Sequence, residues 1–420
     1  GMYGRPGAVE GFKMDRTRHK VVATARHNTA GKNNNSLTYS DDLFELELSD
    51  TDSKLKAKRA INTKDESGKG CKIPVAIGED SIIYHHRSPI ESGDLWKSSD
   101  SNNNVASTKR LTKTMPLSLQ RKLLVPEEVT IFNNEAPLRD GEKLPIHAQI
   151  FTPPKGDGDN SRPLQPLLWL HGGPMAQYSF DCNPLLSWLA SCGYLVMVPN
   201  FSGSTGNGLE FMNRVLAEGC GVTDLSDCLA CATYLQSDEA QAREPRLDLS
   251  RGIAVGGHSW GGYLAFMCML QQQKNGESVF SCGIAAAGIT DWFVQQRHTE
   301  VRYYDYALMG GWVYDKTIAA RARDVSPISK ATELRAPLLV LHGDQDIDVP
   351  FQQIPPFVEA AKRSPHPGAS VEYQAYKGEG HGMAGTETQV DYLKRVKTFL
   401  RINLKPWDFT DNPHGEVTAY

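Results

Sequence analysis

The feature that most constrains the fold of this chain is an alternation of apolar and amphipathic runs that begins near residue 126. The apolar runs are unbroken, which is typical of parallel strands buried on both faces, and the segments between them have helical spacing. This alternation predicts a doubly wound α/β domain with a mostly parallel sheet, in which chemistry gathers beyond the carboxyl ends of the strands. We expect strands at 166–170, 194–199, 252–257, 283–289, 337–343 and 371–376.

The first 125 residues have a different pattern. In DLFELELSD (42–50), apolar and acidic residues alternate as they do in a half-buried strand. The triplets Asp42-Leu43-Phe44 and Asp94-Leu95-Trp96 stand 52 residues apart, close to the ~40–50-residue spacing of propeller blades. We therefore predict two domains: a small β-rich segment that resembles partial propeller blades at 1–125, and an α/β domain at 126–420.

Composition and charge exclude several classes of protein. The chain has 420 residues, 40% of them hydrophobic, yet no run approaches the ~20 apolar residues of a membrane span. A net charge of −4 is too mild for a protein that binds nucleic acid. The start of the chain has no apolar run of the signal-peptide kind, so we expect a cytoplasmic protein. The one C-x-x-C, Cys228 and Cys231, has no second pair, and we expect no metal and no cofactor.

The segment GGHSWGGY (256–263) holds the first candidate for chemistry. Its G-x-S-x-G core follows an apolar run and precedes a helical run, as a nucleophile elbow requires. The small residues Gly257 and Gly261 allow a strained turn that would present the Ser259 hydroxyl to a substrate. The alternative interpretation is a glycine-rich turn between strand and helix that has no chemical role.

A serine hydroxyl needs a base, and the base needs an acid that orients it. His381 lies in the segment KGEGHG directly after the last predicted strand, where the base would belong. The acid would come from GDQDIDVPF (343–351), and the chain order of serine, acid and histidine is that of α/β-hydrolases. The three aspartates of this segment do not make a calcium loop. Counted from the first of them, Val349 and Pro355 occupy the positions where such a loop needs Gly and Glu.

Two loops offer backbone donors for an oxyanion. One N–H belongs to Trp260, the residue after the serine, and the second would come from LHGGP (170–174), where Gly172 and Gly173 leave the backbone accessible. A plain tight turn is the alternative interpretation of LHGGP.

Five ordered motifs resemble the catalytic domain of the prolyl oligopeptidase family, closest to its acylaminoacyl-peptidase branch. They are LHGGP, VPNFSGSTGNG, GGHSWGGY, LHGDQDIDVP and GEGH, and the resemblance extends over about residues 126–405. It implies an α/β-hydrolase fold, with Ser259 as the nucleophile and His381 as the general base.

The resemblance also implies the remaining roles. The family's acid lies in a D-x-x-V-P pattern, which corresponds to Asp346 here. Its oxyanion donors correspond to the backbones of Trp260 and Gly173, and less readily to that of Gly172.

Two departures from the family bear on the substrate. Members often carry Arg two residues after the acid, where it can hold a substrate carbonyl. This chain has Asp348 there, which would favour a cationic group. Asp348 and His171 are our candidates for contacts with the substrate. The β-rich segment has room for about two blades, too few to close a propeller. Its open strand edges would favour pairing with a second copy.

The resemblance implies a serine peptidase that cleaves short peptides through an acyl-enzyme, releasing an N-terminal acylated or small residue. A carboxylesterase would use the same residues, and the missing Arg favours that alternative. A third interpretation is a fragment or paralogue that only binds or assembles. It would require a broken set of catalytic residues, and this sequence does not show one.

Overall fold

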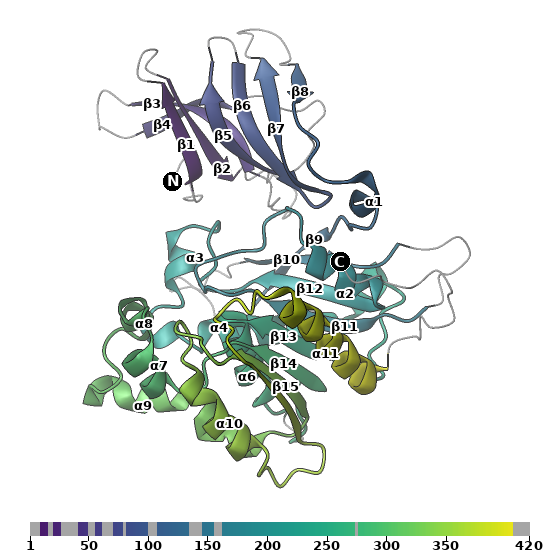
Figure 1. The fold of residues 1–420 in the computed structure, drawn as a ribbon, viewed down its shortest axis with the longest axis vertical. Coiled ribbons are helices and arrows are strands. Elements are labelled where there is room, and N and C mark those ends of the chain that lie inside the picture. Colours follow the sequence, from purple (N-terminus) through teal and green to yellow (C-terminus); the bar gives the residue numbers. More distant parts are fainter. Residues whose placement is uncertain are drawn as a thin grey trace. The chain divides into compact units, whose positions relative to one another are not determined.

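Figure 1 shows the fold of the chain in a computed structural model. The structure describes residues 9–15, 20–26, 41–48, 55–60, 70–78, 81–99, 107–133, 145–154, 162–273 and 276–405. The chain divides into two compact units. The first contains Gly1–Thr130, Gln177–Trp188 and Thr205–Glu210; the second contains Ile131–Ala176, Leu189–Ser204 and Phe211–Tyr420. The domain boundary that we place at Pro126 from the sequence stays a prediction.

The larger sheet has eight strands in the order β16-β15-β14-β13-β11-β12-β10-β9. Its strands from β16 to β12 pair in parallel, and β10 pairs with β12 in antiparallel. The bounds are β9 (Glu127–Phe132), β10 (Pro145–Phe151), β11 (Gln165–Leu170), β12 (Tyr194–Asn200), β13 (Ala254–His258), β14 (Cys282–Ala286), β15 (Pro337–Gly343) and β16 (Ser370–Tyr376). This mostly parallel sheet confirms the predicted α/β-hydrolase fold class.

Two predicted strands have different ends in the structure. The run at 252–257 enters the sheet only at Ala254, because Gly252 has a φ of +76° and turns the chain. The run at 283–289 leaves it after Ala286, where Ala287 has a φ of 48°. In both places a residue with a left-handed backbone conformation limits the strand within an apolar run, before its start in β13 and after its end in β14. Hydrophobicity alone could therefore not reveal the boundary.

Helices connect the strands and cover the sheet. Helix α6 packs against β11, β13 and β14, and α11 packs against β14 and β15. The helices are α1 (Leu117–Gln120), α2 (Pro184–Ser191), α3 (Leu209–Asn213), α4 (Thr223–Leu235), α5 (Asp238–Arg243), α6 (Trp260–Met269), α7 (Trp292–His298), α8 (Arg302–Met309), α9 (Lys316–Asp324), α10 (Ile354–Ala361) and α11 (Thr386–Leu404), with short 3₁₀ helices η1 (Ala217–Gly219), η2 (Pro327–Glu333) and η3 (Phe351–Gln353).

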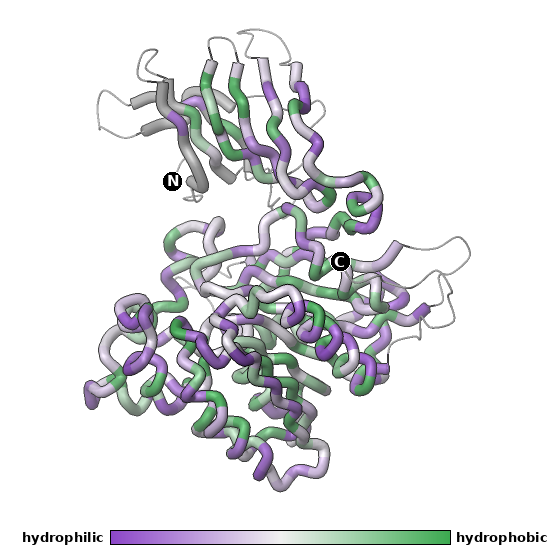
Figure 2. The backbone as a smooth tube through the Cα atoms, viewed as in Figure 1, coloured by the Kyte–Doolittle hydropathy of each residue, from purple (hydrophilic) through white to green (hydrophobic). Residues whose placement is uncertain are grey.

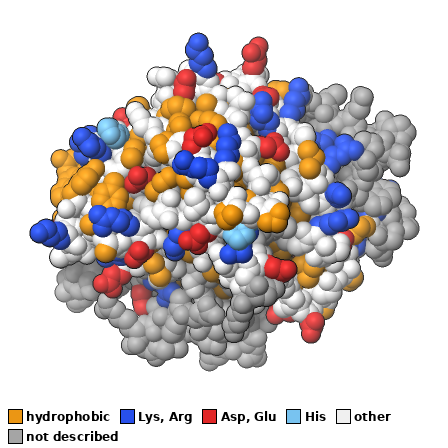
Figure 3. All heavy atoms as spheres, turned by 90° about the horizontal axis from the view of Figure 1, so that it is seen from below, with side chains coloured by type: hydrophobic (Ala, Val, Ile, Leu, Met, Phe, Trp, Pro, Cys, Tyr) orange, Lys and Arg blue, Asp and Glu red, His pale blue; other side chains and the backbone are white. Residues whose placement is uncertain are grey.

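The apolar residues of the larger unit gather in the strands of its sheet (Figure 2). On the face drawn in Figure 3, the acidic and basic side chains of the described residues are interspersed among apolar ones, and those residues form no large patch of a single charge. Within the described parts of the chain, no helix combines the length and the apolar character needed to cross a bilayer.

The β-rich segment consists of two four-stranded antiparallel meanders, which confirms the small β-rich segment expected before the α/β unit. The strands are β1 (Val9–Asp15), β2 (Lys20–Arg26), β3 (Asp41–Leu48) and β4 (Leu55–Ala60), then β5 (Cys71–Ile77), β6 (Ser81–Ser88), β7 (Glu91–Ser99) and β8 (Thr108–Arg110). Each meander has the strand number and order of a propeller blade. One parallel bridge, Asp41 to Cys71, joins them.

The two repeated triplets fall on equivalent strands, the third of each meander. Equivalent residues of the two triplets differ in burial, because Leu43 is fully buried whereas Leu95 is half-exposed. Leu43 and Trp96 nevertheless belong to one apolar cluster, together with Val22, Ile82 and Tyr84. The repeat seen in the sequence therefore marks repeated strands, while their packing differs in detail.

Candidate active site

Ser259 lies in a sharp turn between β13 and α6. Its backbone has φ 59° and ψ −119°, a conformation that is strained for any residue with a Cβ. The turn is possible because its flanks are glycines. A methyl group at Gly257 would lie 2.5 Å from the Gly261 backbone, and one at Gly261 would lie 2.1 Å from the Leu170 carbonyl oxygen. The predicted elbow geometry is thus present at Ser259.

His381 stands between Ser259 and Asp346. The distance from His381 Nε2 to Ser259 Oγ is 2.8 Å, and that from His381 Nδ1 to Asp346 Oδ2 is 2.8 Å. An ionised carboxylate can only accept, so Nδ1 carries the ring proton and Nε2 accepts the hydrogen of the serine hydroxyl. The structure therefore brings together three residues that lie far apart in the sequence, in an arrangement suited to proton transfer from Ser259.

Asp346 lies in the loop after β15, which we call the acid loop (344–350). Its Oδ1 accepts from the backbone N–H groups of Asp348 (3.0 Å) and Val349 (2.8 Å). Its Oδ2 accepts from His381, and His342 Nε2 lies 3.2 Å from the same oxygen. Burial would raise the pKa of Asp346, but the hydrogen bonds from His342 and His381 outweigh burial and hold the pKa well below its usual range. This carboxylate stays ionised beside the imidazole.

The first aspartate of the acid loop ties the neighbouring strand ends together. Asp344 Oδ1 accepts from the backbone N–H of Gly378 at 2.7 Å, in the glycine-rich segment that carries His381. The Gln345 N–H donates to the carbonyl of Glu379 at 2.9 Å. The loops that carry the acid and the base are thus held to each other as well as to their strands.

Two histidines that we did not single out from the sequence support this arrangement. His258 Nε2 lies 2.9 Å from the carbonyl oxygen of His381. Burial, with the neighbouring His381, lowers the pKa of His258 to about 4, so its neutral ring donates from Nε2. His342 is fully buried, and its Nε2 donates to the Val349 carbonyl at 2.8 Å. His258 lies within the motif GGHS and His342 within LHGD, and that position is the only signal the sequence offers.

The candidate oxyanion donors lie around Ser259. A methyl group at Gly172 would be 3.3 Å from Ser259 Cβ and 3.8 Å from its Oγ, so this backbone closely approaches the hydroxyl. Gly173 follows with a φ of +128°, which favours glycine. Trp260 is the first residue of α6, where backbone N–H groups have no intrahelical acceptor. The oxyanion roles of Trp260, Gly173 and Gly172 stay predictions.

His171 belongs to the interior. It is 6% exposed and stacks on Phe201, with ring centroids 4.2 Å apart. Its Nδ1 lies 2.7 Å from the Gly172 carbonyl and its Nε2 lies 2.8 Å from Ser204 Oγ. Burial lowers the pKa of His171 to about 4. These contacts hold the Gly172 loop, and a contact of His171 with the substrate stays a prediction.

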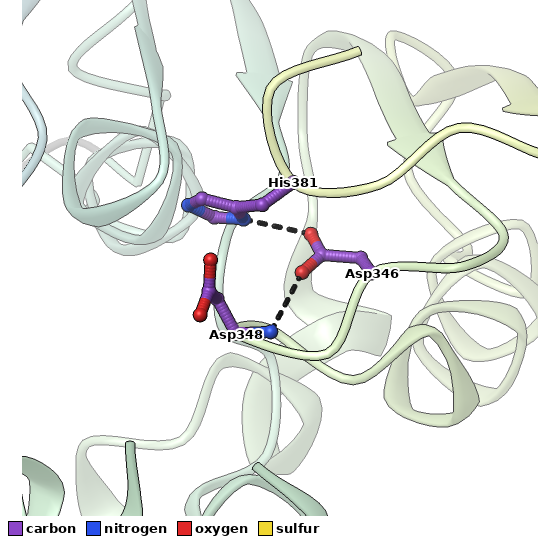
Figure 4. Close-up of side chains that lie close together, drawn as sticks. All are labelled: Asp346, Asp348 and His381. Carbon is purple, nitrogen blue, oxygen red and sulfur yellow. Dashed lines mark hydrogen bonds and ion pairs between the residues drawn. The ribbon is translucent and has the colours of Figure 1, made fainter. Parts of the chain in front are cut away.

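Asp348 lies beside the acid and the base. Figure 4 shows its carboxylate pointing toward the imidazole of His381, next to Asp346. Ligand atoms of Asp346, Asp348 and His381 all lie within 4.8 Å of one another, a spacing that could hold a cation. In the structure, however, Asp346 and His381 are already bonded to each other. A metal at this place would have to displace the hydrogen bond that orients the imidazole.

Asp224 of α4 and Asp305 of α8 are also buried carboxylates, and we call these two the buried-acid pair. Asp224 Oδ2 accepts from the indole N–H of Trp260 at 3.0 Å, and Asp305 Oδ2 accepts from Gln295 Nε2 at 3.0 Å. Burial raises the pKa of both to about 7.

The pattern that defines the prolyl oligopeptidase family matches residues 178–406. The chain is 25% identical over 279 residues to the uncharacterized peptidase YuxL of Bacillus subtilis, covering 66% of this chain and 38% of that protein. It is 26% identical over 356 residues to dipeptidyl aminopeptidase BIII of Pseudoxanthomonas mexicana, covering 81% of this chain and 45% of that protein. This chain thus spans about two fifths of the length of these relatives.

A solved structure agrees in fold. The Pyrococcus horikoshii acylaminoacyl peptidase matches 96% of this chain and 57% of its own chain, with a TM-score of 0.70 at 21% identity. The likeness therefore includes the β-rich segment as well as the α/β unit. Since the family pattern matches more than half of the sequence, this chain belongs to the prolyl oligopeptidase family.

Proposed function

We propose that this protein is a serine peptidase that hydrolyses short peptides through an acyl-enzyme. The observation that carries the proposal is the hydrogen-bonded series from Ser259 through His381 to Asp346, with both distances at 2.8 Å. Membership of the prolyl oligopeptidase family supports it.

The mechanism follows from the geometry. As Ser259 Oγ attacks the scissile carbonyl, His381 Nε2 accepts its proton and then gives it to the leaving amine. Asp346 keeps the ring proton on Nδ1 and stabilises the imidazolium that forms. The backbone N–H groups of Trp260 and of Gly173 or Gly172 would bind the oxyanion. Water then attacks the acyl-enzyme, with His381 as base again, and releases the second product.

A carboxylesterase is the second candidate. Ester and amide hydrolysis share every step named above, and they differ mainly in the leaving group that His381 must protonate. Asp348 favours this alternative, because a carboxylate cannot hold a substrate carbonyl by a hydrogen bond at neutral pH.

Turnover of N-acetyl-Ala-Ala p-nitroanilide and of p-nitrophenyl butyrate by the wild type and by Ser259→Ala tests the proposal. We expect Ser259→Ala to lose at least about 10³-fold in kcat/KM on both compounds. Turnover that survives this substitution would refute the nucleophile. Hydrolysis of the ester without hydrolysis of the anilide would assign the carboxylesterase, and an inert, folded wild type would assign the binding or assembly role.

Two expectations about the whole protein belong to the same proposal. A cytoplasmic location is tested by fractionation of cells that produce the protein. Pairing with a second copy through the open edges of the β-rich segment is tested by sedimentation, in which a monomer at all concentrations would exclude it.

A further inference from the structure

The carboxylate of Asp348 lies next to the reacting atoms, and the proposed mechanism gives it no role. It lies within 4.8 Å of a ring nitrogen of His381, and the two ring nitrogens are already bonded to Ser259 and Asp346. Figure 4 shows it directed toward the imidazole and away from its own backbone. The side chain is half-buried, so part of it still faces solvent from which a ligand can arrive.

The backbone of Asp348 is fixed on both sides. Its N–H donates to Asp346 Oδ1 at 3.0 Å. Its carbonyl oxygen accepts from Gln295 Nε2 at 2.9 Å and from Thr299 Oγ1 at 2.7 Å. These bonds use only main-chain atoms of Asp348. A rigid main chain therefore presents the carboxylate in one place, at little entropic cost to a group that binds it.

The carboxylate itself has no partner among the residues that the structure describes. Asp346, two residues away, accepts from two backbone N–H groups and from His381, with His342 Nε2 3.2 Å from its Oδ2, while no described donor bonds the side chain of Asp348. Two carboxylates this close repel each other, and a half-buried charge without a donor is unfavourable. A cation placed beside Asp348 would remove both costs.

A purely solvated surface acid explains this geometry less well. A surface acid extends into water, whereas Asp348 is half-buried and points toward the imidazole. The apolar surface beside it adds a second feature: Ile347 is 58% exposed, and its carbonyl accepts from the N–H of Glu300, next to the exposed Val301. Alkyl stems of cationic side chains pack on such surfaces while the charged end reaches a carboxylate.

We propose that Asp348 determines specificity by pairing with an alkylammonium or guanidinium group of the substrate close to the scissile bond. The inference rests on the proposed peptidase function and names its substrate class, peptides that carry a positive charge near the cleaved residue. The charge can come from a free amino terminus or from a Lys or Arg side chain. Both present N–H donors to a carboxylate, and both would form a charge-assisted hydrogen bond.

Three p-nitroanilides separate these sources. N-acetyl-Ala-Ala p-nitroanilide is neutral, Ala-Ala p-nitroanilide carries a free amino terminus, and N-acetyl-Lys-Ala p-nitroanilide carries a side-chain cation. We expect the wild type to prefer at least one cationic compound over the neutral one by about tenfold in kcat/KM, as for a partly exposed charge-assisted bond. Preference for the free-amine compound alone assigns the amino terminus, and preference for the lysyl compound alone assigns the side chain.

Asp348→Asn keeps the shape of the side chain and the main-chain bonds that hold the loop. It should lower kcat/KM for the preferred cationic compound about tenfold more than for the neutral one. Asp348→Arg should turn the preference toward N-acetyl-Glu-Ala p-nitroanilide. Glu300→Gln is the matched control, because it removes one exposed acidic charge from the same surface without touching His381, and it should keep the wild-type ratio.

Equal losses on all three compounds in Asp348→Asn would overturn the inference, since they would show that Asp348 acts on His381 and not on the substrate. An unchanged ratio, or a wild type without any cationic preference, would overturn it as well. None of these results touches the proposed function, which fails if Ser259→Ala keeps its activity or if the wild type hydrolyses none of the anilides. Thermal melting of Asp348→Asn checks that the variant is folded.

Discussion

The acid loop and the buried-acid pair both contain carboxylates that are buried to nearly the same extent. The pKa values of these carboxylates are nevertheless shifted in opposite directions. Asp346 is 4% exposed and Asp305 is 3% exposed. The pKa of Asp346 is held well below its usual range, whereas burial raises that of Asp305 to about 7. The difference lies in the hydrogen-bond donors. Asp346 accepts three hydrogen bonds and has His342 Nε2 3.2 Å from its Oδ2, while the structure describes one hydrogen bond to Asp305, from Gln295.

The two regions show that burial alone does not set the charge of an acid in this protein. Desolvation opposes ionisation in both places, and only the acid loop supplies enough N–H groups to overcome it. Two of its donors are backbone N–H groups of the loop itself. They reach the carboxylate because the chain after Asp346 turns back toward it.

The largest effect expected from this contrast is on catalysis. Asp346→Asn removes the charge that orients the imidazole and stabilises the imidazolium, and should lower kcat by about 10³–10⁴-fold. Asp305→Asn changes an equally buried acid in the same chemical way, and should keep activity within about tenfold. Steady-state rates on the neutral anilide check both variants. Similar losses in the two would mean that the acid loop has no special role.

The next effect concerns stability and pH. The folded protein keeps the Asp305 proton up to about pH 7, while the unfolded chain loses it near pH 4. The folded state then binds more protons, so the free energy of unfolding falls as the pH rises from about 4 to 7 and levels off above that.

Asp305→Asn removes this loss. Relative to the wild type, the variant should gain on the order of 3 kcal/mol between pH 4 and pH 8. Urea denaturation of both proteins at the two pH values measures the gain. A difference that does not change with pH would show that Asp305 has an ordinary pKa in the folded state.

The smallest effect concerns the hydrogen-bond donors of the buried-acid pair, which favour the ionised form of a carboxylate. Trp260→Phe removes the indole N–H that donates to Asp224 and leaves the aromatic packing largely in place. With one donor fewer, the ionised form of Asp224 becomes still less favourable, so the variant should lose about 1 kcal/mol more stability at pH 8 than at pH 5. Thermal melting at the two pH values checks this, and an equal loss at both would point to packing instead.

The fold and its reactive strand ends were predictable because they depend on local patterns. Unbroken apolar runs identify the parallel strands, and glycines around Ser259 identify a turn that few other sequences permit. Charge and spacing left three aspartates as candidates for the acid that orients His381. Resemblance to the family singled out Asp346 among them.

Long-range geometry was not predictable in this way. An aspartate is usually a surface residue, and only the tertiary fold buries Asp305 against Gln295. His258 and His342 are visible beside the motifs, but the sequence does not tell where a ring points. The half-exposed Leu95 shows the same limit, since the repeated triplet gave no sign that its side chain differs from Leu43.

The order of the larger sheet also bears on how this protein would lose activity. Among the described strands, β16 is outermost and pairs only with β15, whereas β13 lies in the middle. Edge strands open in local fluctuations that leave the rest of a domain intact. His381 follows β16 and Ser259 follows β13, so a brief detachment of the edge would separate base from nucleophile while the central amides keep their protection against hydrogen exchange. Mild heating would then inactivate the protein reversibly, at a temperature below that of global unfolding.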